Sequence, residues 1–214
     1  MIIRYLTIFA MVLIFSITSV ASAFASWLVY HKPAFKGKVI DAETKEPIEG
    51  VVVVAVYTKT SMGIAESYSV TINVREALTD KNGEFYIPSY TTITQPLSWE
   101  DKATLIIFKP GYGSFPGYPQ SPSGLKPMDH EIFFSEDFGK EREIELWAKG
   151  GPPPKLEKLK LPFGLVELPK LKTREERLKR ILGFPTGFGP KELPLLYKAY
   201  NEEEKMFFDK GDKK

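Results

Sequence analysis

No cysteine occurs in this chain, and only two histidines do, His31 and His130. The lack of cysteine excludes disulfide bonds, thiolate metal sites, cysteine nucleophiles and lipid attachment to an N-terminal cysteine. The histidines lie in different parts of the chain, without the paired ligands of a zinc peptidase or the Gly-x-Ser-x-Gly elbow of a serine hydrolase. We therefore expect no metal, no cofactor and no enzymatic activity.

A large excess of charge of one sign is also lacking, since the formal net charge is +2. Residues 24–154 hold 13 Lys and Arg against 17 Asp and Glu, a difference of −4, and residues 155–214 hold 15 against 10, a difference of +5. Glutamates are interleaved with the lysines of the C-terminal part, so no clustered basic face forms. We expect no nucleic-acid partner and a weak attraction between the two parts.

The N-terminal segment has the organisation of an export signal. A positive start at residues 1–4 precedes an apolar run at 5–20 and the small residues Ala21, Ser22 and Ala23, which predicts a signal peptide over residues 1–23. The alternative is an uncleaved anchor over residues 5–30, because this stretch has no charge and exceeds the roughly 20 residues that span a bilayer. Both interpretations predict an extracytoplasmic protein of the periplasm or cell envelope, and only the second predicts membrane attachment.

Short apolar segments separated by turn residues follow this start. The pattern predicts strands at 35–41, 51–57, 75–79, 84–88, 104–109, 131–134 and 142–147, with a weak strand at 68–74 inside a polar excursion at 58–73. Asp80, Asn82 and Gly83 predict a tight hairpin turn between the strands at 75–79 and 84–88. The alternating oxygen ligands around Gly83 also resemble half of a calcium loop, but the later glutamate of such a loop is missing.

A glycine and proline run at 150–154 predicts a domain boundary, so residues 148–214 form a Pro-rich linker and a Leu/Lys-rich helical tail. An extended strap comes first, because prolines interrupt residues 155–169. Thr173 and Glu176 have the spacing of a capping box and predict a helix up to Gly183. Pro194 predicts the start of a second helix, with Leu196, Tyr200 and Phe207 on one face.

Several short motifs together resemble the carboxypeptidase regulatory-like family. The matching positions are Gly37, Val39, Asp41, Thr44, Pro47, Ile48, Gly50, Val51, Val53, Thr79, Asp80, Asn82, Gly83, Phe85, Ile87, Lys109, Pro110, Gly111 and Tyr112. The resemblance covers residues 35–147 and implies an all-β fold, a seven-stranded antiparallel β-sandwich of the immunoglobulin-like and transthyretin-like kind. It also implies a non-catalytic accessory role on secreted or envelope proteins. The fold expected for the whole chain adds the extended strap and two short helices.

The expected function is that of a structural or protein-interaction module of the envelope, with an envelope protein as partner. The alternative is a carbohydrate- or peptidoglycan-binding module, in which Tyr112, Phe115 and Tyr118 on the loop 110–124 stack on a glycan. A weaker alternative is a transthyretin-like hydrolase, which would require the clustered histidines that this chain lacks.

The strand at 51–57 is apolar at every position, so both of its faces need to be buried. A two-layer sandwich buries one face of each strand, which leaves Val52, Val54 and Val56 without a cover. We expect the tail after Pro154 to dock on this face. The leucines of the strap, together with Phe163, are the expected covering residues.

Overall fold

The computed structural model describes Met11 and residues 29–63, 66–94, 97–116, 130–135, 141–147, 156–173, 175–176 and 184–209. Strands make up most of the regular secondary structure among the described residues, so the prediction of an all-β fold is confirmed. The strands are β1 (Val29–Lys32), β2 (Phe35–Asp41), β3 (Val52–Met62), β4 (Ser67–Leu78), β5 (Glu84–Ile87), β6 (Tyr90–Ile93), β7 (Ser98–Glu100), β8 (Thr104–Phe108), β9 (Glu141–Trp147), β10 (Leu156–Pro162) and β11 (Leu165–Leu168). The helices are α2 (His130–Phe133) and α4 (Pro194–Asp209).

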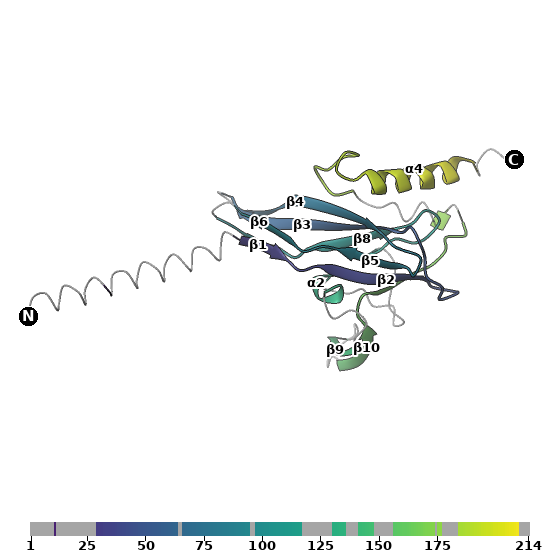
Figure 1. Ribbon diagram of the computed structural model, residues 1–214, viewed down its shortest axis with the longest axis horizontal. Helices are drawn as coiled ribbons and strands as arrows, with labels where there is room; N and C mark the ends of the chain where they lie inside the picture. The colour runs from purple at the N-terminus through teal and green to yellow at the C-terminus, as the bar shows by residue number, and fades with distance from the viewer. Residues whose placement is uncertain are drawn as a thin grey trace, which may run out of the picture.

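Two sheets face each other across the main core. In the first, β3 pairs with β4 along one edge and with β7 and β8 along the other. The second has the order β11–β2–β5, and the pair β1–β6 continues it beyond Pro33 and Pro88. Figure 1 shows α4 outside the layer of β3 and β4, and the β9–β10 pair on the other side of the molecule. Among the described strand pairs, only β11–β2 is parallel.

Strand β3 is the centre of the fold because it carries neighbours on both edges. Successive side chains of a strand point to opposite faces of the sheet, so Val53, Ala55 and Tyr57 enter the core between the sheets. The residues between them, Val52, Val54 and Val56, belong to a second cluster on the outer face. The predicted excursion at 58–73 is wrong, since β3 continues to Met62 and β4 begins at Ser67, with a bulge between Tyr57 and Thr58.

The predicted hairpin at residues 80–83 is half wrong. The tight turn is present: Asp80 Oδ1 accepts hydrogen bonds from the Asn82 and Glu84 amides, and Gly83 has a φ of 73°. However, β4 pairs with β3 whereas β5 pairs with β2, so the turn joins the two sheets. Thr79 fixes this crossing because its buried hydroxyl accepts from Val51 N and donates to Ile48 O.

The strand predicted at 131–134 is also wrong, because residues 130–133 form the helix α2. In a strand, the adjacent side chains of Phe133 and Phe134 would point to opposite faces. The helical turn directs both into the main core, where their exposures are 4% and 0%. Packing of two neighbouring aromatic rings therefore decides the conformation of this segment.

The C-terminal part contributes to both layers. The strap is extended as expected, but β11 completes the β2 sheet, and Phe163, Val166 and Leu168 lie in the main core. The capping box is confirmed, because Glu176 N donates to Thr173 Oγ1 and Thr173 N donates to Glu176 Oε2. Residues 1–28 of the signal or anchor segment, except Met11, and the linker at 150–154 lie outside the described residues, as does most of the helix predicted before Gly183. The last two residues of the predicted anchor, Val29 and Tyr30, belong to β1.

Candidate functional site

The outer face of the β3 sheet is the candidate site. Val52, Val54 and Val56 have exposures of 3%, 0% and 6%, although each points away from the core between the sheets. Val74 of β4 and Phe108 of β8 extend the same apolar face. Left open to water, a continuous face of this kind would be an association surface.

Helix α4 covers this face. Leu193, just before the helix, and Leu196 and Ala199 within it are buried against the valines. Their spacing of three residues places them on one side of the helix. Phe184 borders the cluster, with its ring centroid 4.6 Å from that of Tyr197 and 5.1 Å from that of Tyr200. The buried helix face therefore differs from the predicted one: Leu196 belongs to it, Tyr200 lies at its border, and the side chain of Phe207 is outside the described structure.

Two carboxylates fasten the helix to the sandwich. Glu76 of β4 accepts hydrogen bonds from Leu195 N at 2.9 Å and Leu196 N at 2.7 Å. These amides belong to the first turn, where helix N–H groups lack partners and the helix dipole favours a negative charge. Farther along the helix, Glu203 accepts a hydrogen bond from Gly111 N in the loop after β8.

The prediction that the strap covers Val52, Val54 and Val56 is therefore wrong about which part of the tail forms the cover. The tail does lie on this face, but the described covering side chains come from residues 184–199, and the strap residues Phe163, Val166 and Leu168 lie in the main core. The end of the strap lies in the other layer because Gly164 and β11 hydrogen-bond to β2, whereas β10 pairs with β9 in a separate two-stranded sheet. The charge of the sandwich also acts locally, through Glu76 at the helix start.

The structure separates the three aromatic residues that were expected to bind a glycan. Phe115 has an exposure of 0% and packs against His130 and Phe134, with ring centroids 4.8 Å and 5.5 Å away. The interpretation of Phe115 as a ligand-facing residue is therefore wrong, because a core ring has no free face for a sugar. Tyr112 is half-buried and donates a hydrogen bond to Asp41 Oδ2, and Tyr118 lies outside the described residues.

Asp41 lies at the junction between β2 and the tail. Its carboxylate accepts hydrogen bonds from Glu43 N at 2.8 Å and Thr44 N at 3.0 Å, and Lys170 Nζ is 3.3 Å away. Burial by itself raises the pKa of Asp41, but the two backbone hydrogen bonds and Lys170 hold it below its ordinary value. This geometry is that of a turn-stabilising carboxylate tied to the tail.

A buried ion pair lies near the β1 end of the core. Lys32 has an exposure of 2%, and its ammonium group pairs with Glu100 at 2.6 Å and with Glu131. Burial raises the pKa of the neighbouring Tyr30, and the charges of Glu100 and Glu131 raise it further. Lys32 therefore joins β1, β7 and α2 through charge, and the pairing satisfies a cation that would be costly to bury alone.

The histidines have structural contacts in separate places. His31 Nδ1 is 2.7 Å from Thr91 Oγ1 on β6, and His130 Nδ1 accepts a hydrogen bond from Leu105 N at 2.8 Å. In the described part of the chain, no group of three or more His, Asp or Glu residues is arranged to hold a metal ion.

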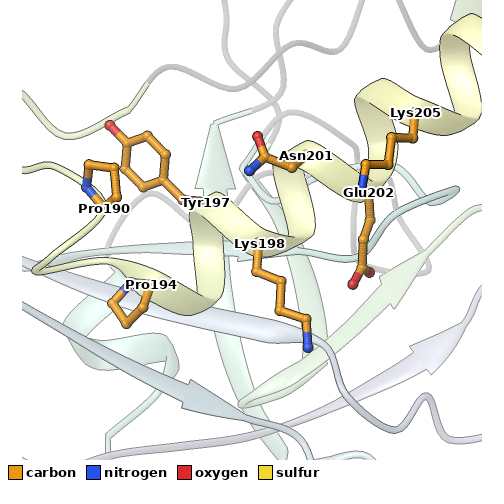
Figure 2. Close-up of a pocket in the computed structure, with 7 residues that line it drawn as sticks. All are labelled: Pro190, Pro194, Tyr197, Lys198, Asn201, Glu202 and Lys205. Carbon is orange, nitrogen blue, oxygen red and sulfur yellow. The ribbon is translucent and has the colours of Figure 1, made fainter.

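An open groove of about 410 Å³ runs along the solvent side of α4. Figure 2 shows Pro190, Pro194 and Tyr197 at the start of the helix and Lys198, Asn201, Glu202 and Lys205 farther along it. The charged residues of this groove, Lys198, Glu202 and Lys205, are exposed. The groove therefore belongs to the outer surface of the cover.

Sequence reasoning missed Glu76, Glu203 and Lys32. Glu76 stands directly opposite Val54 in the β3–β4 pair, so it is a charged residue on an otherwise apolar face. Such a residue would stand out as a candidate once the pairing register is known, but the register depends on a bulge that the sequence does not reveal.

No protein-family model, curated protein or solved structure matches this chain. None of the described helices is long and apolar enough to span a membrane.

Proposed function

We propose that this chain is a non-enzymatic extracytoplasmic protein whose β-sandwich acts as a protein-interaction module, with an envelope protein as partner. The interaction surface in this proposal is the outer face of β3, β4 and β8, which α4 occupies in the free protein. The observation that carries it is the burial of Val52, Val54 and Val56 beneath one helix. Export rests on the signal or anchor pattern of residues 1–30.

The way α4 is held supports this proposal. The sheet beneath it already has its backbone hydrogen bonds, because β3 pairs with β4 and β8 along the same residues. Departure of α4 would thus break side-chain packing and two carboxylate contacts, but no ladder of the sheet. A partner helix with apolar residues at the same spacing would bury the same valines, as amphipathic helices do in apolar grooves.

We further propose that the sandwich is of the immunoglobulin-like, transthyretin-like kind found in the carboxypeptidase regulatory-like family. The glycines of the motifs support this, since each stands where a side chain is disfavoured. A Cβ at Gly37 would lie 2.6 Å from the Phe85 ring and 2.7 Å from Gly164 O. Gly50 and Gly111 have φ values of 68° and 82°, which L-residues rarely adopt.

The proposal is tested by opening the cover in the full-length protein. Leu196→Asp places a carboxylate among the valines, whereas Lys198→Asp changes an exposed residue of the same helix. We expect Leu196→Asp to remove hydrogen-exchange protection from α4 while β3 and β8 stay protected. Capture of an envelope partner should increase severalfold for this variant alone.

The captured protein must also compete with the cover. A synthetic peptide of residues 190–209 should displace it from the Leu196→Asp variant, because both would occupy the same face. Equal capture by wild type, Leu196→Asp and Lys198→Asp, or capture that this peptide does not affect, would contradict the proposal. Should Leu196→Asp unfold the sandwich, Glu76→Gln provides a milder way to loosen the helix.

A further inference from the structure

Exposed apolar side chains gather at one end of the sandwich. We call this end the apolar rim, defined by Val29, Met62, Tyr68, Ile93, Leu97 and Trp99. Their exposures are 47%, 59%, 54%, 80%, 72% and 44%, in the same order. Residues of this kind are normally scattered over a protein surface, and a contiguous group marks a contact surface.

Strand pairing brings the rim together from both sheets. Val29 and Ile93 are partners in β1 and β6, while Met62 N donates to Leu97 O at 3.0 Å. Tyr68 lies opposite Ser61, and Trp99 lies opposite the neighbouring residue Thr60. Figure 1 shows β1 beginning at the same end as the turn between β3 and β4.

The chain itself indicates what covers this rim. Residues 5–28 form an uncharged, mostly apolar run that ends at Val29, the first residue of β1 and a member of the rim. No linker separates the two in the sequence, so in the anchored form, in which residues 5–30 stay uncleaved, the membrane that holds this run lies next to the rim. Trp99 and Tyr68 are the residue types that concentrate at membrane interfaces.

We propose that the apolar rim dips into the interfacial layer of a lipid bilayer, so that β3 and β4 extend from the rim away from the membrane surface. The rim would then fix the orientation of a sandwich that a single anchor would leave free to tilt. This surface lies at the opposite end of β3 from the valines beneath α4, so it is independent of the proposed interaction face.

The charges beside the rim predict that it does not distinguish anionic from zwitterionic lipids. The neighbouring titratable residues are His31, Lys59, Glu66, Glu100, Asp101 and Lys102, of which three are acidic and two are lysines. Lys32 is buried in its ion pairs and unavailable to lipid. Among the described residues, the rim therefore lacks the basic cluster that recognises anionic headgroups. Its binding should be as strong on zwitterionic phosphatidylcholine as on anionic phosphatidylserine.

The experiment uses the full chain reconstituted into phosphatidylcholine vesicles with lipids brominated near the headgroup. W27F and W147F substitutions leave Trp99 as the only tryptophan. A matched reporter carries Leu78→Trp with all three native tryptophans replaced by phenylalanine. Leu78 is exposed at the other end of β4, roughly 33 Å from Tyr68 at about 3.3 Å per residue.

We expect the brominated lipid to reduce Trp99 emission severalfold and to leave the reporter at position 78 unchanged. The double substitution Ile93→Asp and Leu97→Asp should restore most of the Trp99 emission, whereas Leu78→Asp should not. Circular dichroism confirms that the variants are folded. Added phosphatidylserine should leave the quenching unchanged.

Three results would overturn the proposal. One is Trp99 emission that is insensitive to brominated lipid but shielded from aqueous iodide, which would assign the rim to a second protein copy or another partner. Another is equal quenching at positions 99 and 78, which would mean that the sandwich lies flat. The last is failure of the full chain to associate with vesicles.

Discussion

The C-terminal part of the chain attaches to the sandwich in two different ways, through β11 and through α4. Strand β11 is joined by backbone hydrogen bonds, with Lys38 N donating to Gly164 O at 2.8 Å and Ala42 N to Leu168 O at 3.0 Å. Just after it, Gly113 N donates to Pro169 O at 2.8 Å. Helix α4 has its own backbone hydrogen bonds and contacts the sandwich through side chains and the two carboxylate contacts.

This difference teaches which part of the tail belongs to the fold. Val166 and Leu168 have exposures of 0% and lie between the sheets, so removing β11 would open the main core and one sheet edge together. Removing α4 would expose an apolar face but leave both sheets intact. We therefore expect β11 to unfold only with the whole sandwich, and α4 to open by itself in a local fluctuation.

The largest effect that tests the difference between β11 and α4 is expected from Leu168→Ala. Truncation of a fully buried leucine leaves a cavity and typically costs about 2 to 5 kcal/mol of stability. We expect this loss in the global free energy of unfolding, measured by urea denaturation. Leu165→Ala, on the half-buried side of the same strand, is the matched control and should cost less. Loss of exchange protection in residues 163–172 alone would show that β11 is as detachable as α4.

A second test concerns the carboxylate that ties β2 to the end of β11. The pKa of Asp41 is lowered in the folded state, so the stability that its charge contributes is present above the unfolded pKa of about 4 and is lost as the pH falls below it. Asp41→Asn should cost about 2 kcal/mol at pH 7, because hydrogen bonds to a charged group are replaced by neutral ones.

The pH dependence separates this contribution from a loss of packing. The stability difference between wild type and Asp41→Asn should shrink below about pH 4, where the wild-type carboxyl becomes protonated as well. Glu46→Gln, at an exposed position of the same turn, should change neither quantity. A difference that stays constant down to pH 2 would assign the effect of Asp41→Asn to shape and not to charge.

The need for a cover on β3 could be foreseen, but not which part of the tail supplies it, and the pairing of β11 with β2 was not foreseen. Residues 51–57 are apolar at every position, and this alone predicts a second buried face on β3. The sequence could not tell which leucines cover it, because Leu165 and Leu168 in the strap and Leu193 and Leu196 before and within α4 are equally apolar. Backbone pairing with β2 places the end of the strap in the other sheet. The carboxylate of Glu76, which accepts from the first turn of α4, helps to place the helix on the valines.

Local signals predicted turns better than strand partners. The side chain of Asp80 and the positive φ of Gly83 depend on neighbours in sequence, so that turn was predicted correctly. Whether β4 and β5 share a sheet depends on Thr79 reaching Val51 and Ile48, which are far away along the chain. The same limit explains α2, where the burial of Phe133 and Phe134 is a tertiary effect.

The smallest expected effect is also the sharpest test of the detachable helix. In Glu76→Gln the side chain keeps one oxygen that can accept a hydrogen bond from the first turn of α4, but the second acceptor oxygen and the negative charge facing the helix dipole are lost. The charge contributes about 0.3 to 1 kcal/mol and the lost hydrogen bond about 1 kcal/mol, so the exchange of α4 amides should become roughly 10- to 30-fold faster. The global free energy of unfolding should stay the same, because β3 and β4 keep their pairing.

Glu202→Gln removes an exposed carboxylate from α4 itself and serves as the control, with no expected change at the first turn. Native-state hydrogen exchange followed residue by residue measures both effects. If Glu76→Gln accelerates exchange in β3 and β8 as much as in α4, the helix opens only together with the sandwich, and α4 is then as integral to the fold as β11.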